Sequence, residues 1–238
     1  RIWAFHKHFT GQDVGGGYEK VLSIESIPDF VNLRDDVYMC IERVVDGNTV
    51  RYIEELAPRG AEGGLGEHTW YVDCGGIYSG SATSNISGLD HLEGRDVTGI
   101  AWDADTVPFV VTGTVSSGSV DIGAQVTDAI IGLPYVSTIK TMRISTADIF
   151  NTMQGEKKKI TECIVRVQDS TTFQIAQSPE AYRDSRDTTI DTGTNGVISQ
   201  DSRETGPGGM TYDGQIFIQN STPTPLTVQA LIMEVDTA

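Results

Sequence analysis

The sequence predicts an all-β protein of antiparallel strands, and three observations support this class. The 238 residues include 26 glycines, among many Ser, Thr, Val and Ile residues, and this composition favours short strands joined by turns. Apolar and polar residues alternate along most of the apolar segments. The best helix candidate is the single segment Ser145–Gly155. We therefore expect an all-β fold with at most one short helix.

Residues 1–56 have the pattern of an antiparallel sheet. Val45-Asp46-Gly47-Asn48 is a strong hairpin signal, because Asp-Gly readily adopts the positive φ angles of a two-residue turn. The segments on either side of it should therefore pair directly. The expected strands are Arg1–Phe9, Tyr18–Ile24, Asp36–Val44 and Thr49–Leu56.

The Gly-rich segment Pro58–Glu67 has the composition of a linker, and short strands follow it. The tight polar turn Gly88–Gly94 precedes an alternating apolar run that ends at Asp103-Ala104-Asp105. Many short strands in so few residues predict a small β-barrel. Its expected strands are Thr69–Asp73, Thr83–Ile86, Val97–Trp102, Thr106–Gly113, Ser119–Ile122 and Asp128–Leu133.

The remainder of the chain should return to a sheet. In the helix candidate, Ser145 or Thr146 can cap the first turn, and Ile149 and Met153 lie one turn apart. Gly155 can end that helix. The polar residues 178–212 are expected to form a long loop. The expected strands are Tyr135–Ile144, Ile160–Gln168, Gly214–Gln219 and Leu226–Val235.

These patterns predict two structural units. Residues 1–66 and 136–238, from both ends of the chain, should form one antiparallel sheet or sandwich unit, derived from a propeller. The small barrel, residues 67–135, should be inserted into it. On this division the Asp46-Gly47 hairpin and the strand Ile160–Gln168 belong to the same unit.

The formal net charge is −16 and the pI is about 4.5, so binding of nucleic acid through a basic face is disfavoured. The charge fits either simple solubility or an acidic surface that DNA passes without binding. Cys40, Cys74 and Cys163 are far apart and are expected to pack as small apolar residues. No apolar run approaches the roughly 18 residues of a membrane span. Because strand pattern begins at Ile2, we expect the C-terminal portion of a longer polypeptide.

No motif in the sequence predicts a catalytic, cofactor or metal site. His6 and His8 share a strand face, but no spacing fixes a third ligand. Asp103 and Asp105 lack the glycine and the distal glutamate of a calcium loop. No nucleophile elbow or phosphate-binding loop occurs, and no pair of acids is singled out for glycoside hydrolysis.

Two charged groups remain as candidates. Lys157, Lys158 and Lys159 form the only basic cluster. It fits either a solvated start of a strand or an assembly contact with an acidic copy of the chain or with DNA. Arg51 and Glu54 fall on opposite faces of one strand, so we expect cross-strand pairs with Glu42 or Arg43 rather than one site.

Several short blocks together resemble the C-terminal part of phage tail proteins of the nozzle, or tail tubular protein B, type. Similar sequences are often described as containing the first catalytic-cysteine half-domain of ubiquitin-activating enzymes, which denotes a small β-barrel and implies no ubiquitin chemistry. The blocks are Trp3-Ala4-Phe5-His6-Lys7-His8, Arg51-Tyr52-Ile53-Glu54-Glu55-Leu56, Gly88-Leu89-Asp90-His91-Leu92-Glu93-Gly94, Gly132-Leu133-Pro134-Tyr135, Lys157-Lys158-Lys159-Ile160 and Pro225-Leu226-Thr227-Val228-Gln229-Ala230-Leu231.

The resemblance implies a non-enzymatic virion protein, made in the host cytoplasm, that forms a hexameric ring around the DNA exit channel of a tail. Its partners would be copies of itself, neighbouring tail adaptor proteins, and genomic DNA that passes without specific binding. No catalytic residue is carried over. The chain departs from the family in lacking most of a propeller before Arg1, and Tyr182–Met210 matches no family block.

Two other functions compete with this one. A host-receptor or carbohydrate-binding module of a phage tail would show exposed Trp and Tyr residues forming a stacking platform, whereas Trp3, Trp70 and Trp102 fall in expected strands. A tail-borne hydrolase would show paired acids about 5–10 Å apart in a cleft.

Overall fold

The computed structural model confirms the all-β class. Strands dominate the described part of the chain, where the one helical element is the short 3-10 turn η1 (Asp90–Leu92). All of the named sheets are antiparallel. The structure describes residues 19–31, 33–57, 70–103, 108–144, 147–148, 151–152, 155–185, 197–206 and 208–237.

The chain divides into two compact units. Unit 1 comprises Arg1–Ala61 and His68–Tyr135, and unit 2 comprises Glu62–Glu67 and Val136–Ala238. This division differs from the expected one, because the N-terminal sheet belongs with residues 68–135 and not with residues 136–238. The Asp46-Gly47 hairpin and the strand around Ile160 consequently lie in different units. A buried ion network, described below, joins the two sheets of unit 1.

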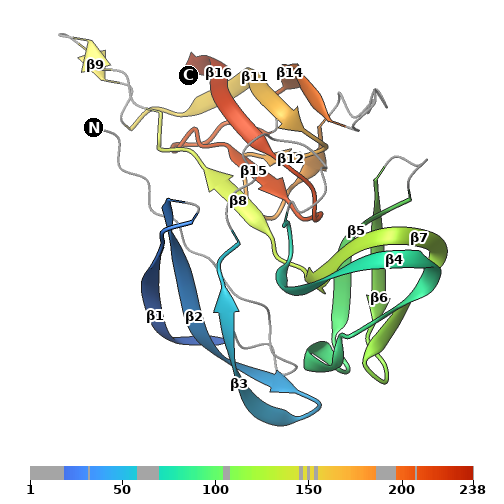
Figure 1. The fold of residues 1–238 in the computed structure, drawn as a ribbon. Coiled ribbons are helices and arrows are strands. Elements are labelled where there is room, and N and C mark those ends of the chain that lie inside the picture. Colours follow the sequence, from blue (N-terminus) through green and yellow to red (C-terminus); the bar gives the residue numbers. More distant parts are fainter. Residues whose placement is uncertain are drawn as a thin grey trace. The chain divides into compact units, whose positions relative to one another are not determined.

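The first sheet of unit 1 has the order β1-β2-β3, with β1 (Lys20–Asp29), β2 (Arg34–Val45) and β3 (Asn48–Glu55). The predicted hairpin is confirmed: β2 and β3 pair directly, and φ is 47° at Asp46 and 73° at Gly47. Both central residues therefore have the positive φ of the turn that matches strand twist. Figure 1 shows this sheet in blue. The expected strand Arg1–Phe9 lies outside the described residues.

The second sheet of unit 1 has the order β4-β7-β5-β6. Its strands are β4 (Asp73–Ser87), β5 (Asp96–Trp102), β6 (Phe109–Thr114) and β7 (Ser119–Leu133). Segments expected to be separate short strands are joined into the long strands β4 and β7. Three register shifts interrupt their pairing, and such bulges bend strands and increase their twist.

This second sheet is not the closed barrel that the strand count predicted. The short strand β6 pairs with β5, and no described pairing joins it to β4 at the opposite edge. Closure requires every strand to be paired on both sides with a fixed stagger. Here the sheet instead curls over its core through the bulges of β4 and β7 (Figure 1).

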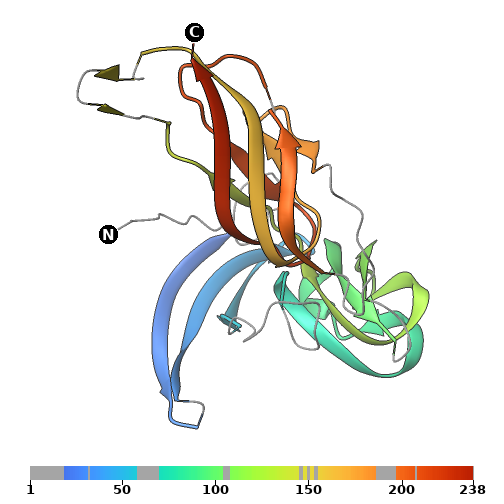
Figure 2. The ribbon, with the colours of Figure 1, turned by 90° about the horizontal axis from the view of Figure 1, so that it is seen from above.

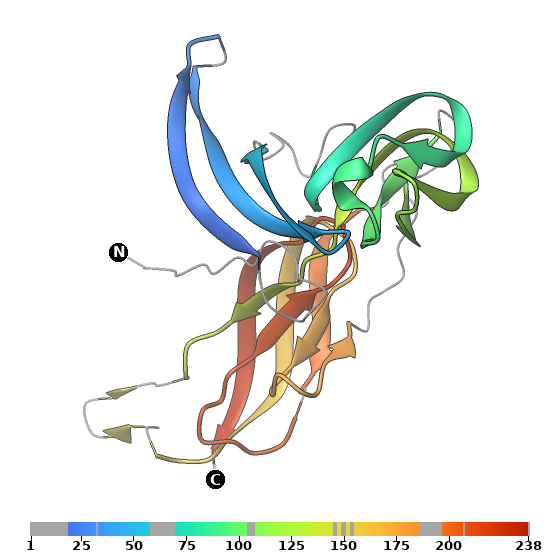
Figure 3. The same cartoon turned by 90° about the horizontal axis from the view of Figure 1, so that it is seen from below.

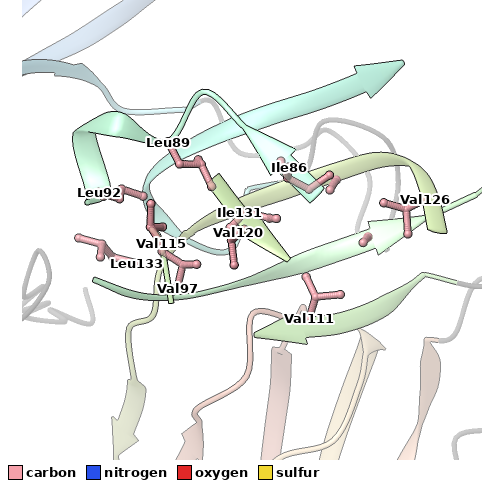
Figure 4. Packing of buried hydrophobic residues seen from close by; sticks show 12 residues of the cluster. Ile86, Leu89, Leu92, Val97, Val111, Val115, Val120, Val126, Ile131 and Leu133 are labelled. Carbon is pink, nitrogen blue, oxygen red and sulfur yellow. The ribbon is translucent and has the colours of Figure 1, made fainter. Parts of the chain in front are cut away.

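The core of unit 1 lies inside this curled sheet, and the turn Gly88–Gly94 contributes to it. Leu89 and Leu92 are fully buried there, so the segment expected to be a polar turn carries two core residues. β5 is buried along most of its length because it is a central strand of the sheet. Its residues therefore do not show the alternation between buried and exposed positions that the sequence predicted. Figure 4 shows the cluster: Ile86, Leu89, Leu92, Val97, Ala101, Val111, Val115, Val120, Val126, Ala129, Ile131 and Leu133.

The carboxylate of Glu93 holds the turn between β6 and β7. It accepts hydrogen bonds from the backbone N–H groups of Gly118 and Ser117, both at 2.8 Å. These two bonds, the one from Gly118 first, lower the pKa of Glu93 from its ordinary value. Since the folded pKa lies below the unfolded one, the resulting stability is present above the unfolded pKa of about 4.3. It is lost as pH falls through the folded pKa.

We therefore expect Glu93→Gln to lower the urea midpoint of unit 1 at pH 7, and we expect this deficit to be smaller at pH 3, because the wild-type carboxylate gains protons as pH falls toward its folded pKa. Urea titrations of both proteins at the two pH values measure this. An equal deficit at pH 7 and pH 3 would mean that the charge of Glu93 is not what secures the turn.

Unit 2 is a two-layer β-sandwich. One sheet has the order β14-β11-β16 and the other the order β13-β12-β15-β8; Figure 2 shows β14, β11 and β16 side by side. Both sheets contribute to one core that contains Ile160, Cys163, Val165, Phe173 and Ile218. The strands are β8 (Ser137–Lys140), β11 (Lys158–Ser170), β12 (Gln174–Ala176), β13 (Arg183–Asp184), β14 (Ile198–Thr205), β15 (Phe217–Asn220) and β16 (Thr227–Thr237).

The predicted helix Ser145–Gly155 is wrong. Two two-residue strands occupy it, β9 (Ala147–Asp148) and β10 (Asn151–Thr152), which pair as an antiparallel hairpin. Helices of this length are marginal without tertiary packing, and Thr and Asn are weak helix formers.

The long polar loop predicted for residues 178–212 contains two strands, β13 and β14. β14 forms an edge of the sandwich, where it pairs with β11. Polar side chains are compatible with such a strand because one of its faces meets water. The segment Tyr182–Met210, which matched no family block, therefore supplies part of the unit 2 framework in its described residues.

Candidate functional site

The basic cluster does not present one continuous surface. Lys157 and Lys159 are exposed, but Lys158 between them is only 2% exposed. Successive side chains of a strand point to opposite faces, so one member of the trio is directed inward. Its ammonium group donates to the backbone oxygens of Glu156 at 3.2 Å and Tyr212 at 3.0 Å. Lys158 is thus a structural residue, and the predicted role in assembly is left to Lys157 and Lys159.

Lys157 belongs to an exposed surface that we call the basic corner, formed by Met142, Arg143, Lys157 and Tyr212. The Lys157 ammonium lies 5.6 Å from the centre of the Tyr212 ring, a cation–π distance. Backbone hydrogen bonds from Lys158 to Thr211 and from Ile144 to Asp213 hold the three contributing segments together. Met142 is 87% exposed, and Arg143 forms an ion pair with Asp213 at 3.0 Å. The corner combines apolar surface with positive charge.

The sheet β1-β2-β3, with its connecting turn, forms an arm whose outer end carries three apolar side chains. Phe30, Val31 and Leu33 are 85%, 89% and 90% exposed. We call these residues the apolar tip. The backbone N–H of Val31 donates to the Asp29 carboxylate at 2.8 Å, which fixes the start of the turn. Such strongly exposed neighbouring apolar side chains are typical of an interaction surface.

The pairing register of β1, β2 and β3 explains why the apolar tip is exposed. Pairing of β3 with β2 ends at Tyr38, whereas β1 continues to pair with β2 as far as Arg34. The outer end of the arm is therefore a two-stranded ribbon, and Figure 3 shows β1 and β2 extending together beyond β3. On one face of the arm, burial falls from complete at Ile41 to slight at Ile24 near the ribbon. The apolar residues on both sides of Pro28 were the sequence signal for this surface, and they lie between the expected strands Tyr18–Ile24 and Asp36–Val44.

A buried ion network anchors the base of the arm to the second sheet of unit 1. The Glu19 carboxylate contacts the guanidinium groups of Arg43 and Arg95, the latter at 2.8 Å. Arg43 also forms a two-pronged pair with Glu54, at 2.6 and 2.7 Å. Arg95 donates to the backbone oxygen of Val44 at 3.2 Å. Because the side chains of Glu19 and Arg43 are 1% exposed, the network is a structural clamp and not an accessible site.

The opposite face of the arm carries the second predicted cross-strand pair. Arg51 contacts Glu42 at 3.1 Å, and both residues lie opposite the face that carries Arg43 and Glu54. The prediction that Arg51 and Glu54 belong to separate pairs is confirmed. The exposed pair adds little stability, since solvent screens it.

Cys74 and Cys163 are not activated nucleophiles. Burial raises the pKa of Cys74 to about 12 and that of Cys163 to about 11, so both thiols stay protonated near neutral pH, whereas nucleophilic attack requires the thiolate. Cys163 lies in the core of unit 2 and Cys74 packs against that of unit 1, as expected of small apolar residues. Cys40 is half-buried.

The described residues contain no group of three or more His, Cys, Asp or Glu side chains arranged to hold a metal ion. His91 makes a hydrogen-bond contact with the Cys74 backbone oxygen at 3.0 Å and meets the Tyr52 ring edge to face. His6, His8, His68 and Asp105 lie outside the described residues, as does the block Trp3–His8.

No protein-family model matches the chain, and no curated protein is similar to it in sequence. Within the described residues, no helix has the length and apolarity needed to cross a membrane.

Proposed function

We propose that this chain is a structural, non-enzymatic component of a phage tail that assembles with copies of itself into a nozzle-type ring around the DNA exit channel. The observation that carries the proposal is the apolar tip, because a cluster of three almost fully exposed apolar side chains is favourable only when a partner covers it. The ring as the form of the assembly is what the resemblance of the sequence blocks to tail nozzle proteins implies.

The construction of the arm supports a mechanical role. Its base is held by the buried contacts of Glu19 with Arg43 and Arg95, so the arm has a fixed attachment to the second sheet. A firmly held surface loses little conformational freedom on association, which leaves more of the contact energy for binding. A hexamer and contacts with neighbouring tail adaptor proteins are the arrangement implied by the resemblance.

The net charge supports passage of DNA without capture. Double-stranded DNA carries one negative charge per about 1.7 Å, and a basic channel wall would bind it through release of counterions. A chain of net charge −16 repels the phosphates and leaves the genome free to slide. In this proposal the protein resides in the virion and contacts DNA without specificity.

The competing function, a host-receptor or carbohydrate-binding module, calls for a platform of exposed aromatic rings. Among the described aromatic residues, Phe30 and Tyr212 are the strongly exposed ones, and they belong to different units. Selective binding on a glycan array would favour this competitor. Release of sugar or peptide from cell-wall polymer would favour a hydrolase.

The proposal is tested in purified virions. Mass spectrometry should detect the chain, antibody labelling should place it on the tail, and electron microscopy of the isolated protein should reveal rings with a central pore. Absence of the chain from virions would overturn the proposal.

A further inference from the structure

We infer that the apolar tip of one copy docks on the basic corner of a second copy. This inference rests on the proposed assembly function and specifies the contact. The two surfaces are chemically complementary: Phe30, Val31 and Leu33 offer apolar surface, while Met142 and Tyr212 offer apolar surface beside cations.

Charge complementarity singles out the basic corner as the receiver of the tip. Residues 20–56, which form the arm, carry eight acidic and four basic side chains. Asp29, Asp35 and Asp36 flank the tip, and Arg34 forms an ion pair with Asp36 at 2.8 Å. Residues 137–159 instead carry five basic and two acidic side chains. Of the five, Lys158 is buried and Arg143 pairs with Asp213, so Lys140, Lys157 and Lys159 supply the exposed positive charge. In molecules of net charge −16, this local pairing of opposite charge steers the copies into one orientation.

The contact joins two different patches, one on each copy. An interface of this kind leaves a free tip on one copy and a free corner on the other, so further copies can add until a ring closes. A tip-to-tip contact would close at two copies, and it would also bring two acidic rims together, which like-charge repulsion opposes. An anionic membrane surface would repel the same aspartates.

The contact is tested by mixing two variants of the whole chain. Phe30→Ser disables the tip, and Lys157→Glu disables the corner, both at exposed positions. We expect wild-type protein to associate with rising concentration in sedimentation equilibrium, and each variant alone to associate at least about tenfold more weakly. An equal mixture should form a dimer that does not grow, because one intact tip then meets one intact corner.

Two matched variants control for general effects. Ile53→Ser removes an exposed apolar side chain from the arm away from the tip, and Arg203→Glu makes the same charge change on an exposed residue of unit 2. Both should associate as wild type does. Circular dichroism should show melting close to that of the wild type for all four variants, with the largest expected decrease for Arg203→Glu, which loses an exposed ion pair with Glu162.

The docking contact would be overturned if the wild-type chain stayed monomeric up to high concentration, or if Phe30→Ser and Lys157→Glu left association unaffected. It would also be overturned if the mixture of the two variants failed to form a dimer. Flotation of the wild-type chain with anionic phospholipid vesicles, abolished by Phe30→Ser, would mean that the tip binds a membrane instead. Rings that form regardless of both changes would leave the proposed ring function standing without this contact. Absence of the chain from virions would overturn the proposed function even if docking were observed.

Discussion

Replacing Arg43 with methionine is expected to destabilise unit 1 by about 3–5 kcal/mol, the usual cost of removing one partner from a buried ion pair. Arg43 contacts both Glu19 and Glu54, and its side chain is almost completely buried. Methionine fills much of the volume but leaves Glu19 with Arg95 alone and Glu54 without its two-pronged partner. Desolvated carboxylates that lose a counter-charge are costly because no water replaces it.

The matched control is Arg51→Met on the other face of the same strand pair. Arg51 also bonds a glutamate across β2 and β3, but it is exposed, so its loss should cost below about 1 kcal/mol. Urea unfolding, followed by hydrogen exchange of the amides in β2 and β5, measures the free energy of unfolding of unit 1 in both variants. Because these amides lie in unit 1, the values do not include the unfolding of unit 2. Equal losses for the two variants would contradict the assignment of a buried clamp.

A second replacement in the Arg43→Met variant identifies why unit 1 loses stability. In Arg43→Met combined with Glu54→Met, the uncompensated carboxylate of Glu54 is gone while Glu19 keeps its contact with Arg95, so part of the lost stability should return. Additive losses would instead show that Arg43 acts mainly through packing of its aliphatic stem.

Replacing Lys158 with alanine is expected to destabilise unit 2 by about 2–5 kcal/mol, because the substitution both opens a cavity and removes a buried donor. The Lys158 ammonium holds the backbone oxygens of Glu156 and Tyr212, and its stem faces Gly214, where even an added Cβ would lie 3.2 Å from the Lys158 Cδ atom.

Lys159→Ala is the matched control, one residue along the same strand. Lys159 is exposed, so the free energy of unfolding should change by no more than about 0.5 kcal/mol. Lys158→Met keeps the stem and removes only the donor, and it should fall between the two, at about 1–3 kcal/mol. Urea titrations followed by hydrogen exchange in β11 give all three values. Lys158 and Lys159 variants of equal stability would refute the inward placement of Lys158.

Features fixed by neighbouring residues could be predicted from the sequence. The Asp46-Gly47 turn adopts its hairpin because the two residues accept positive φ wherever they occur. Once that turn sets the register, Arg51 lies directly opposite Glu42, and the two-residue period places Glu54 on the same face as Arg43. The all-β class follows from the same local preferences summed over the chain.

Features that depend on long-range pairing could not be predicted. Gly75, Gly76 and Gly80 indicate a loop in isolation, yet they lie within β4 because β7 supplies a partner strand. The Ser145–Gly155 segment has helical spacing, but within it Ala147–Asp148 pairs with Asn151–Thr152 as short strands, since spacing alone does not stabilise so short a helix. The Lys157–Lys159 run gives no sign that its middle member is buried, because that depends on the segments around Tyr212 and Gly214.

The sequence by itself determined that this protein is built from antiparallel strands, where its tightest hairpin lies, and that its surface is acidic, because these properties depend on residue type and near neighbours. Only the tertiary structure decided that the N-terminal sheet joins residues 68–135, that the second sheet curls without closing, and that Phe30, Val31 and Leu33 lie exposed beyond a clamped arm. Burial and strand partnership are properties of contacts between distant segments, and no local pattern specifies them.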